Sequence, residues 1–206
     1  MNEGTKRLGV LLFPGFELLD VFGPAEMLGN LPGAVEVKMV AEKAGPVASA
    51  QGVSVVADYG FDGCPHLDLV LVPGGIGTRA EVENVVLLAF LKERAAAAEI
   101  AMTVCTGTAL LARAGLLDGR RATTNKMFFH WVAEQGPQVH WVKAARWVED
   151  GKFATSSGVS AGMDMALAVI TRLAGADISS NIATATEYDW HRDASWDPFA
   201  KVHGLV

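Results

Sequence analysis

The sequence has little of what secreted, membrane and nucleic-acid-binding proteins need. Only 2 of its 206 residues are cysteines, and Cys64 and Cys105 stand in dissimilar contexts, which disfavours a disulfide framework and favours a reducing compartment. The apolar run after residue 7 ends at Pro14, too early for a secretory leader or a membrane span. With 17 basic and 23 acidic side chains the net charge is -6, which disfavours a broad basic surface. We expect a cytoplasmic protein that binds neither membrane nor nucleic acid.

The chain also lacks an internal division. Without a Pro/Ser-rich linker or an internal repeat, we expect one domain over residues 1–206, with a C-terminal arm from about residue 190. Half of the residues are apolar and 19% are charged, as in globular proteins. A chain of this length buries about 70% of its unfolded surface, so it needs no structural metal. We expect no cofactor and no metal.

Short apolar runs alternate with stretches of helical periodicity. The runs and the helical patterns that follow them cover residues 8–13 then 18–28, 67–72 then 84–98, and 100–104 then 106–114. This alternation predicts an α/β fold with a mostly parallel central sheet and helices on both faces. Beyond it we expect an edge hairpin near Gly52, a tight hairpin at Asp150-Gly151, and helices over 126–134, 158–173 and 177–190.

Cys105 is the first candidate for chemistry. It follows the apolar run 100–104 and stands where a helix begins near Thr106. The carboxyl end of a central strand is where α/β sheets bind ligands, and a helix N-terminus lowers the pKa of a thiol. Position alone supports an inert buried cysteine equally well. Gly74-Gly75 after the neighbouring strand favours the reactive interpretation, because glycines let backbone N–H groups approach a ligand closely.

Asp20 is the second candidate. It lies among apolar residues in the segment 13–24, just after the first strand, and burial would raise the pKa of its carboxyl and suit it to proton transfer. A structural role as a helix or turn cap is the alternative, and spacing alone favours the cap.

Four motifs together resemble the ThiJ/PfpI superfamily, and most closely its isocyanide hydratase branch. They are FPGFELLDVFGPAEML, LVLVPGGIGTRA, VCTGTALLARAGLLDGRRATT and SSGVSAGMDMAL, and they cover most of residues 7–174 in order. The resemblance implies a flavodoxin-like sandwich of the class I glutamine amidotransferase-like type, a homodimer and a small-molecule substrate. It also implies Cys105 as nucleophile, Asp20 as its acidic partner, and Gly75 and Thr106 as donors to a developing negative charge, with the Thr106 hydroxyl as a further contact.

The sequence departs from many relatives after the ATT of RATT, where they carry a histidine and this chain has Asn125. Asparagine cannot act as a general base, so a Cys-His protease or amidase is disfavoured. His130 could substitute only if the fold turned it inward, and its aromatic neighbours favour a packing or surface role. The arm also differs from the proline-rich sequence of hydratase relatives.

Two rival signals carry less weight. Residues 158–162 match the G-x-S-x-G elbow around Ser160, but the 44 residues after them are mostly helical in pattern, and close packing of a helix explains the small residues better. Cys64 and His66 could begin a metal site, but no further ligands stand at suitable spacing.

The sequence therefore predicts a cysteine-dependent hydratase that converts isocyanides to N-formamides through a covalent thioimidate. A glyoxalase-type hydratase of 2-oxoaldehydes is the alternative within enzymes, because it also needs only a cysteine and an acid. A cysteine-based redox or ligand sensor without turnover is the alternative from another class.

Overall fold

A seven-stranded sheet forms the centre of the protein, described here from a computed structural model that covers residues 4–31, 33 and 35–206. The strand order is β10-β11-β7-β6-β1-β2-β5, and all neighbours are parallel except the antiparallel pair β10 and β11. The strands are β1 (Lys6–Leu11), β2 (Val35–Ala41), β5 (Tyr59–Gly60), β6 (Leu69–Val72), β7 (Ile100–Thr103), β10 (Trp147–Asp150) and β11 (Phe153–Ser156). The predicted α/β class with a mostly parallel sheet is confirmed.

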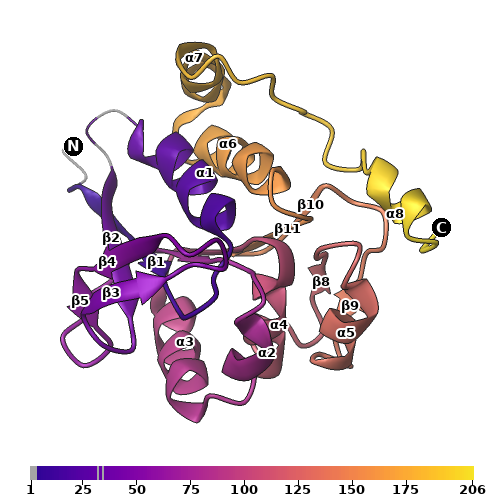
Figure 1. The fold of residues 1–206 in the computed structure, drawn as a ribbon. Coiled ribbons are helices and arrows are strands. Elements are labelled where there is room, and N and C mark those ends of the chain that lie inside the picture. The colour runs from indigo at the N-terminus through magenta and orange to yellow at the C-terminus, as the bar shows by residue number, and fades with distance from the viewer. Residues whose placement is uncertain (1–3, 32, 34) are drawn as a thin grey trace.

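Helices cover both faces of this sheet (Figure 1). On one face lie α1 (Leu18–Gly29), α6 (Ala161–Ala174) and α7 (Ala176–Ala185), and on the other lie α2 (Thr78–Glu81), α3 (Val85–Ala97) and α4 (Thr108–Arg113). Strands β6 and β7 are buried along their whole length, because a central strand covered on both sides meets only apolar neighbours. In the described part of the chain, no helix has the length and apolar character needed to span a bilayer.

Two small sheets stand outside the central one. Strands β3 (Gly45–Ala48) and β4 (Ser54–Ala57) form the antiparallel hairpin expected around Gly52, and β8 (Arg121–Ala122) pairs with β9 (His140–Trp141) next to α5 (Phe129–Glu134). The tight hairpin at Asp150-Gly151 joins β10 to β11, and Gly151 has the positive φ of 61° that such a turn requires.

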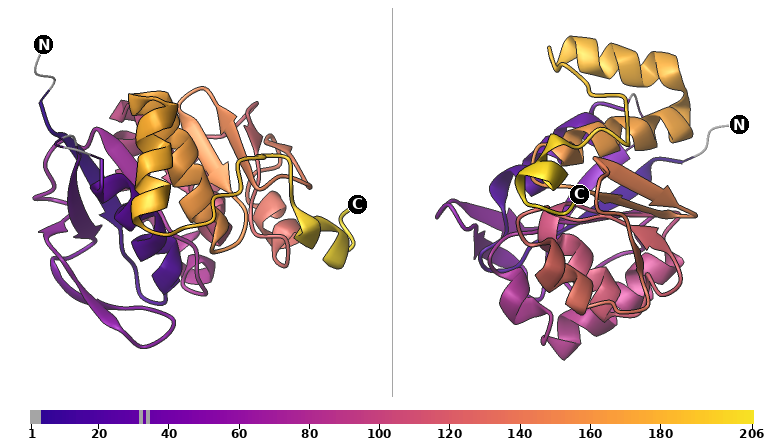
Figure 2. Two further views of the ribbon diagram at one scale, coloured as in Figure 1. Left: turned by 90° about the horizontal axis from the view of Figure 1, so that it is seen from above. Right: turned by 90° about the vertical axis from the view of Figure 1, so that its right-hand side faces the viewer.

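The helix predicted over 177–190 ends too late, which is an error of the sequence prediction. Helix α7 ends at Ala185, Glu187 takes a φ of +51°, and the N–H of Tyr188 donates to the carbonyl of Ala183. This left-handed turn redirects the chain, which then crosses to the side of the molecule where α5 lies (Figures 1 and 2).

The crossing segment ends in the short helix α8 (Pro198–Val202), which packs against α5 through Phe129, Ala200 and Leu205. A buried ion pair fixes it in place, because the ammonium of Lys126 lies 3.1 Å from a carboxylate oxygen of Asp197. The C-terminal arm is therefore anchored through Asp197, Ala200 and Leu205, while most of its other residues are exposed.

Candidate active site

The carboxyl ends of four neighbouring strands, β11, β7, β6 and β1, supply the candidate residues. Cys105 follows β7, Gly74 and Gly75 follow β6, Asp20 lies in the first turn of the helix after β1, and Val159 lies in the turn after β11. Parallel strands end at the same edge of a sheet, which is why segments distant in sequence meet here. Three of these four positions were predicted from strand ends, and the structure brings all three together.

Cys105 stands on a strained elbow. Its φ is +56°, a left-handed conformation that costs a side-chain-bearing residue about 1–3 kcal/mol. Two hydrogen bonds hold it: the Cys105 N–H donates to the Ser157 carbonyl at 3.0 Å, and the Thr124 hydroxyl donates to the Cys105 carbonyl at 2.7 Å. The backbone at Cys105 is therefore held from the segment after β11 and from the loop after β8.

The thiol of Cys105 is nearly enclosed, with 6% of the residue exposed. Burial, followed by the nearby carboxyl of Asp20, raises its pKa to about 12, although hydrogen bonds from the Thr106 N–H, the Val159 N–H and the Asn125 side chain lower it. The sequence predicts a lowered thiol pKa from the helix N-terminus, and this prediction is wrong, because the net pKa is raised. A helix N-terminus contributes less than the loss of water around a buried thiolate.

Asp20 is completely buried and is not a helix cap. The residue at the cap position of α1 is Glu17, and the Oδ2 atom of Asp20 instead accepts a hydrogen bond from the Gly74 N–H at 2.8 Å. Its Oδ1 atom has no hydrogen-bond partner among the described residues. Burial raises the pKa of the Asp20 carboxyl to about 8, with the bond from Gly74 opposing and the charge of Glu17 adding to the rise. Near neutral pH this carboxyl holds a proton that it can transfer.

The glycine pair after β6 allows this close approach. A Cβ at Gly74 would lie 2.6 Å from the Thr106 nitrogen and 2.9 Å from the Asp20 Oδ2 atom. Gly75 has a φ of +119°, and its N–H donates to the Thr106 hydroxyl at 3.1 Å. The Thr106 N–H points at the thiol of Cys105. Both N–H groups predicted to stabilise a developing negative charge therefore lie at the site, and each already has an acceptor.

Sequence reasoning missed Asn125 and Val159. Asn125 was noted only because it replaces a histidine, but its side chain donates a hydrogen bond to the Cys105 thiol. Val159 has a φ of +36° and offers its N–H to the same thiol. The motif that contains each residue was visible, but no pattern shows that two loops from different strands converge on one sulfur atom.

His130 and Cys64 lie away from this site, whereas Ser160 directly follows Val159 at its edge and has its hydroxyl near Arg146. His130 is exposed on α5, Ser160 is exposed and contacts Arg146 at 3.4 Å, and Cys64 is a buried loop residue whose thiol contacts the carbonyl of Pro65 at 3.5 Å. Among the residues that the structure describes, no group of three or more His, Cys, Asp or Glu side chains is placed to hold a metal.

A cavity of about 250 Å³ lies beside the loops that donate to the Cys105 thiol, and Cys105 itself is not among its lining residues. Its lining includes Asn125 and Val159, the two loop residues that donate to Cys105, together with Met127. The C-terminal arm supplies Phe199 and His203 to its opposite side. The C-terminal arm therefore forms a wall of the space next to the site.

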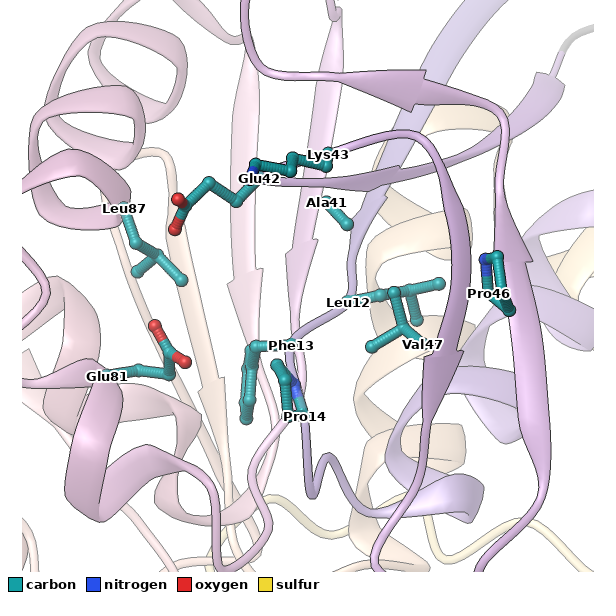
Figure 3. A pocket seen from close by; sticks show the side chains of 10 residues that line it. All are labelled: Leu12, Phe13, Pro14, Ala41, Glu42, Lys43, Pro46, Val47, Glu81 and Leu87. Atoms are coloured by element: carbon teal, nitrogen blue, oxygen red, sulfur yellow. The ribbon is translucent and has the colours of Figure 1, made fainter.

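A second cavity, of about 330 Å³, lies at the ends of β1 and β2 (Figure 3). Leu12, Val47 and Leu87 give it an apolar lining, and the carboxylates of Glu42 and Glu81 stand near its edge, both bonded to the Asn84 side chain. Cys105 and Asp20 line neither cavity, but the residues that donate to the Cys105 thiol, Asn125 and Val159, line only the smaller one, which is therefore the one next to the nucleophile.

The protein is a flavodoxin-like sandwich. It carries a cysteine on the elbow after a central strand, with a buried acid beside the cysteine. The chain belongs to the DJ-1/PfpI family, whose sequence profile matches residues 6–172. Isonitrile hydratase of Pseudomonas putida is 37% identical to it over 184 residues, which cover 88% of this chain and 78% of that protein.

Other relatives have different names. The HTH-type transcriptional regulator GbdR of Pseudomonas aeruginosa is 31% identical over 91% of this chain, which covers 52% of the regulator. Among solved structures, a THiJ/PfpI family protein from Pseudomonas syringae superimposes with a TM-score of 0.84 at 32% identity, over 93% of this chain and 80% of that one. Drosophila melanogaster DJ-1beta shares the fold, with a TM-score of 0.79 at 22% identity over 90% of this chain and 100% of that one. The chain is therefore similar in sequence both to an isonitrile hydratase and to part of a transcriptional regulator.

Proposed function

We propose that this chain is a hydratase that uses Cys105 to add water to isocyanides, giving N-formamides. The observation that carries the proposal is a fixed, strained cysteine beside a buried carboxyl, Asp20, that has one unpartnered oxygen. The 37% identity to an isonitrile hydratase supports the substrate class. A nucleophile and a proton donor are the two groups that this hydration needs.

In the proposed reaction, the Cys105 thiolate attacks the terminal carbon of R–N≡C and forms an S–C bond. Asp20 delivers a proton to that carbon, which gives a covalent thioimidate, R–N=CH–S. Water then adds to the same carbon as Asp20 takes one of its two protons, and the nitrogen gains the other, which the new hydroxyl gives up as the adduct collapses to the formamide carbonyl. Collapse of the tetrahedral adduct breaks the S–C bond, releases R–NH–CHO and returns the thiolate. One water is added overall, with no oxidation or reduction.

The raised pKa values of both groups define how the thiolate forms. With values of about 8 for Asp20 and about 12 for Cys105, the first proton lost from the pair comes from Asp20, and its carboxylate then takes the proton of the Cys105 thiol as the substrate binds. In the form with a protonated Asp20 and a thiolate, the N–H groups of Thr106 and Val159 and the side chain of Asn125 stabilise the sulfur. That form holds both the nucleophile and the proton for the first step.

Replacing the nucleophile tests the proposal directly. We expect Cys105→Ala to abolish hydration of small isocyanides without unfolding the protein, because the change removes the sulfur and little volume. Cys64→Ala is the matched control and should keep full activity, and Ser160→Ala should do the same. The measurements are formamide production and intact mass, where a substrate adduct should form on Cys105. Turnover by Cys105→Ala, or its loss in Ser160→Ala, would contradict the assignment.

The same assay separates the alternative functions. A panel of isocyanides and 2-oxoaldehydes shows which electrophile is hydrated with saturation kinetics, and turnover of the aldehydes alone would favour the glyoxalase-type reaction. Regulators such as GbdR motivate the third outcome, a sensor. A sensor would change partner binding when Cys105 is oxidised and would turn over neither substrate.

We also propose that residues 1–206 act as one unit and form a homodimer through α1 and the β3–β4 hairpin. Leu19 and Phe22 on α1 are each 41% exposed and Val53 in the hairpin is 47% exposed. The hairpin adjoins the helix, because the side chain of Gln51 accepts a hydrogen bond from the Leu18 N–H. These apolar side chains are candidates for burial by a second copy. A monomer in sedimentation at micromolar concentration would contradict the dimer.

Both free thiols fit a cytoplasmic location.

A further inference from the structure

Arg79 lies beside the candidate active site and packs on two aromatic rings. Its guanidinium carbon is 4.0 Å from the ring centre of Trp131 and 4.4 Å from that of Phe128. Both rings belong to the segment that begins with Asn125, whose side chain contacts the Cys105 thiol and also accepts a hydrogen bond from the Phe128 N–H. Stacking fixes the plane of a guanidinium and leaves its N–H edge free to bind.

This guanidinium has no carboxylate partner within the described chain. Six other arginines lie within 4.0 Å of an acidic side chain, namely Arg7, Arg94, Arg113, Arg120, Arg146 and Arg172. The one hydrogen bond of the Arg79 side chain to a described residue goes from Nη1 to the Thr78 hydroxyl at 3.2 Å. Arg79 is half-buried, and burial lowers its pKa. A guanidinium that has lost part of its hydration and keeps most of its donors unused favours an incoming anion.

A short chain of hydroxyls connects Arg79 to the reacting groups. The Thr78 hydroxyl that accepts its hydrogen bond lies 3.2 Å from the Thr106 hydroxyl, and the latter accepts the bond from the Gly75 N–H. The charge of Arg79 also interacts favourably with the thiolate of Cys105. An anion bound to the free edge of Arg79 would therefore lie next to an electrophile placed on Cys105.

We propose that Arg79 is a specificity-determining residue that binds a carboxylate of the substrate. The preferred substrates are then small molecules in which the electrophilic carbon lies a few bonds from a carboxylate, such as α-isocyano acids. The planar fork of a guanidinium matches the two oxygens of a carboxylate. The choice of isocyano acids rests on the proposed hydratase function, but the binding of an anion beside Cys105 does not.

A pair of thiol reagents tests anion binding without turnover. Iodoacetate and iodoacetamide both form an S–C bond with the Cys105 thiolate and expel iodide, and they differ in charge. The ratio of their rates cancels any change in the amount of thiolate. On a Cys64→Ala background, followed by intact mass, we expect Arg79→Gln to lower the iodoacetate/iodoacetamide ratio about tenfold, as one screened charge pair would. Arg79→Lys should retain part of the preference.

Arg113→Gln is the matched control, because Arg113 is an arginine of the neighbouring α4 that already pairs with Glu83 at 3.0 Å. It should leave the ratio unchanged. Salt gives a second measurement if Arg79→Gln does not fold: raising ionic strength from about 0.05 to about 1 M should lower the ratio in the unaltered protein. Without an attracting cation, the net charge of -6 would make salt raise it instead. A folded Arg79→Gln protein with an unchanged ratio, or a ratio that rises with salt, overturns the proposal.

Substrates connect the inference to the proposed reaction. Isocyanoacetate and its methyl ester differ in one charge, and Arg79→Gln should lower kcat/KM about tenfold for the acid and less than about twofold for the ester. If neither compound is hydrated while the reagent ratio still falls in Arg79→Gln, the hydratase proposal fails and the anion site stands. If the ester and the acid lose activity equally, Arg79 positions the site and does not select a carboxylate.

Discussion

Two aspartates are completely buried in this protein, on helices that pack against each other, and their surroundings differ. Asp164 on α6 accepts hydrogen bonds from Arg146 at 2.5 Å, the Tyr188 hydroxyl at 3.1 Å and the His191 N–H at 3.0 Å. Asp20 on α1 accepts one bond, from Gly74, and has no cation in contact among the described residues.

The comparison separates a structural carboxylate from a chemical one. Burial raises the pKa of both, but Arg146, Tyr188 and His191 oppose the rise at Asp164 and stabilise its charged form. The carboxyl of Asp20 lacks such partners, and its pKa reaches about 8. A buried acid without a countercharge is unfavourable for folding, and such acids occur where a proton must be exchanged.

The largest expected effect is on catalysis, when Asp20 loses its proton chemistry. Asp20→Asn keeps the shape and an acceptor for the Gly74 N–H, but an amide cannot transfer the proton. We expect isocyanide hydration to fall about 10²–10⁴-fold while Asp20→Glu retains some activity. Steady-state kinetics measure the loss, and circular dichroism checks the fold. An Asp20→Asn enzyme with unaltered turnover would remove Asp20 from the mechanism and leave Cys105 in place.

The second effect is on stability, and it belongs to the other aspartate. Asp164→Asn leaves the guanidinium of Arg146 buried without a countercharge, so we expect the free energy of unfolding to fall by about 3–5 kcal/mol. Urea denaturation measures this loss. The protein that remains folded should keep its kcat, because Asp164 does not touch the thiol. A large fall in kcat of Asp164→Asn without a change in stability would show that Asp164 acts in catalysis and not in holding the fold.

A third effect is on the pH dependence of stability. The pKa of Asp20 is about 8 in the folded protein and about 3.9 in an unfolded chain, so between these values the folded state holds the extra proton. The free energy of unfolding therefore falls as pH rises through this window, by up to about 1.4 kcal/mol for each pH unit. Asp20→Asn should remove this slope, so that the stability of the variant relative to the parent increases from pH 5 to about 7.5. Parallel stability curves for the two proteins would contradict the raised pKa.

The sequence was sufficient for the positions of these groups but not for their charge. Strand ends placed Cys105, Gly75 and Asp20 at one edge of the sheet, because alternating strands and helices fix which loops meet. The same reasoning predicted a low thiol pKa from the helix N-terminus. It could not include the burial and the Asp20 carboxyl that raise that pKa, because both depend on packing between elements distant in sequence.

The arm shows the same limit. Its mixture of aromatic and charged residues indicates a partly exposed arm, and most of its residues are exposed, but the helical periodicity of 177–190 hid the turn at Glu187. In the structure, Asp197 compensates the buried charge of Lys126, and the backbone of His191 contacts Asp164. A sequence pattern reports local preference, and these contacts form only once the fold has brought the arm across the molecule.

The smallest expected effect tests whether the arm shapes the substrate site in addition to stabilising the fold. Phe199 is 49% exposed and lines the cavity beside Asn125 and Val159, so Phe199→Ala should raise KM for a bulky apolar isocyanide about threefold to fivefold and leave KM for methyl isocyanide unchanged. Val202→Ala, on the same helix but 72% exposed and outside that lining, is the control and should change neither value. Kinetics with the two substrates measure the difference. Equal changes in KM for both substrates, or the same change in Val202→Ala, would mean that the arm stabilises the fold around Lys126 without shaping the substrate pocket.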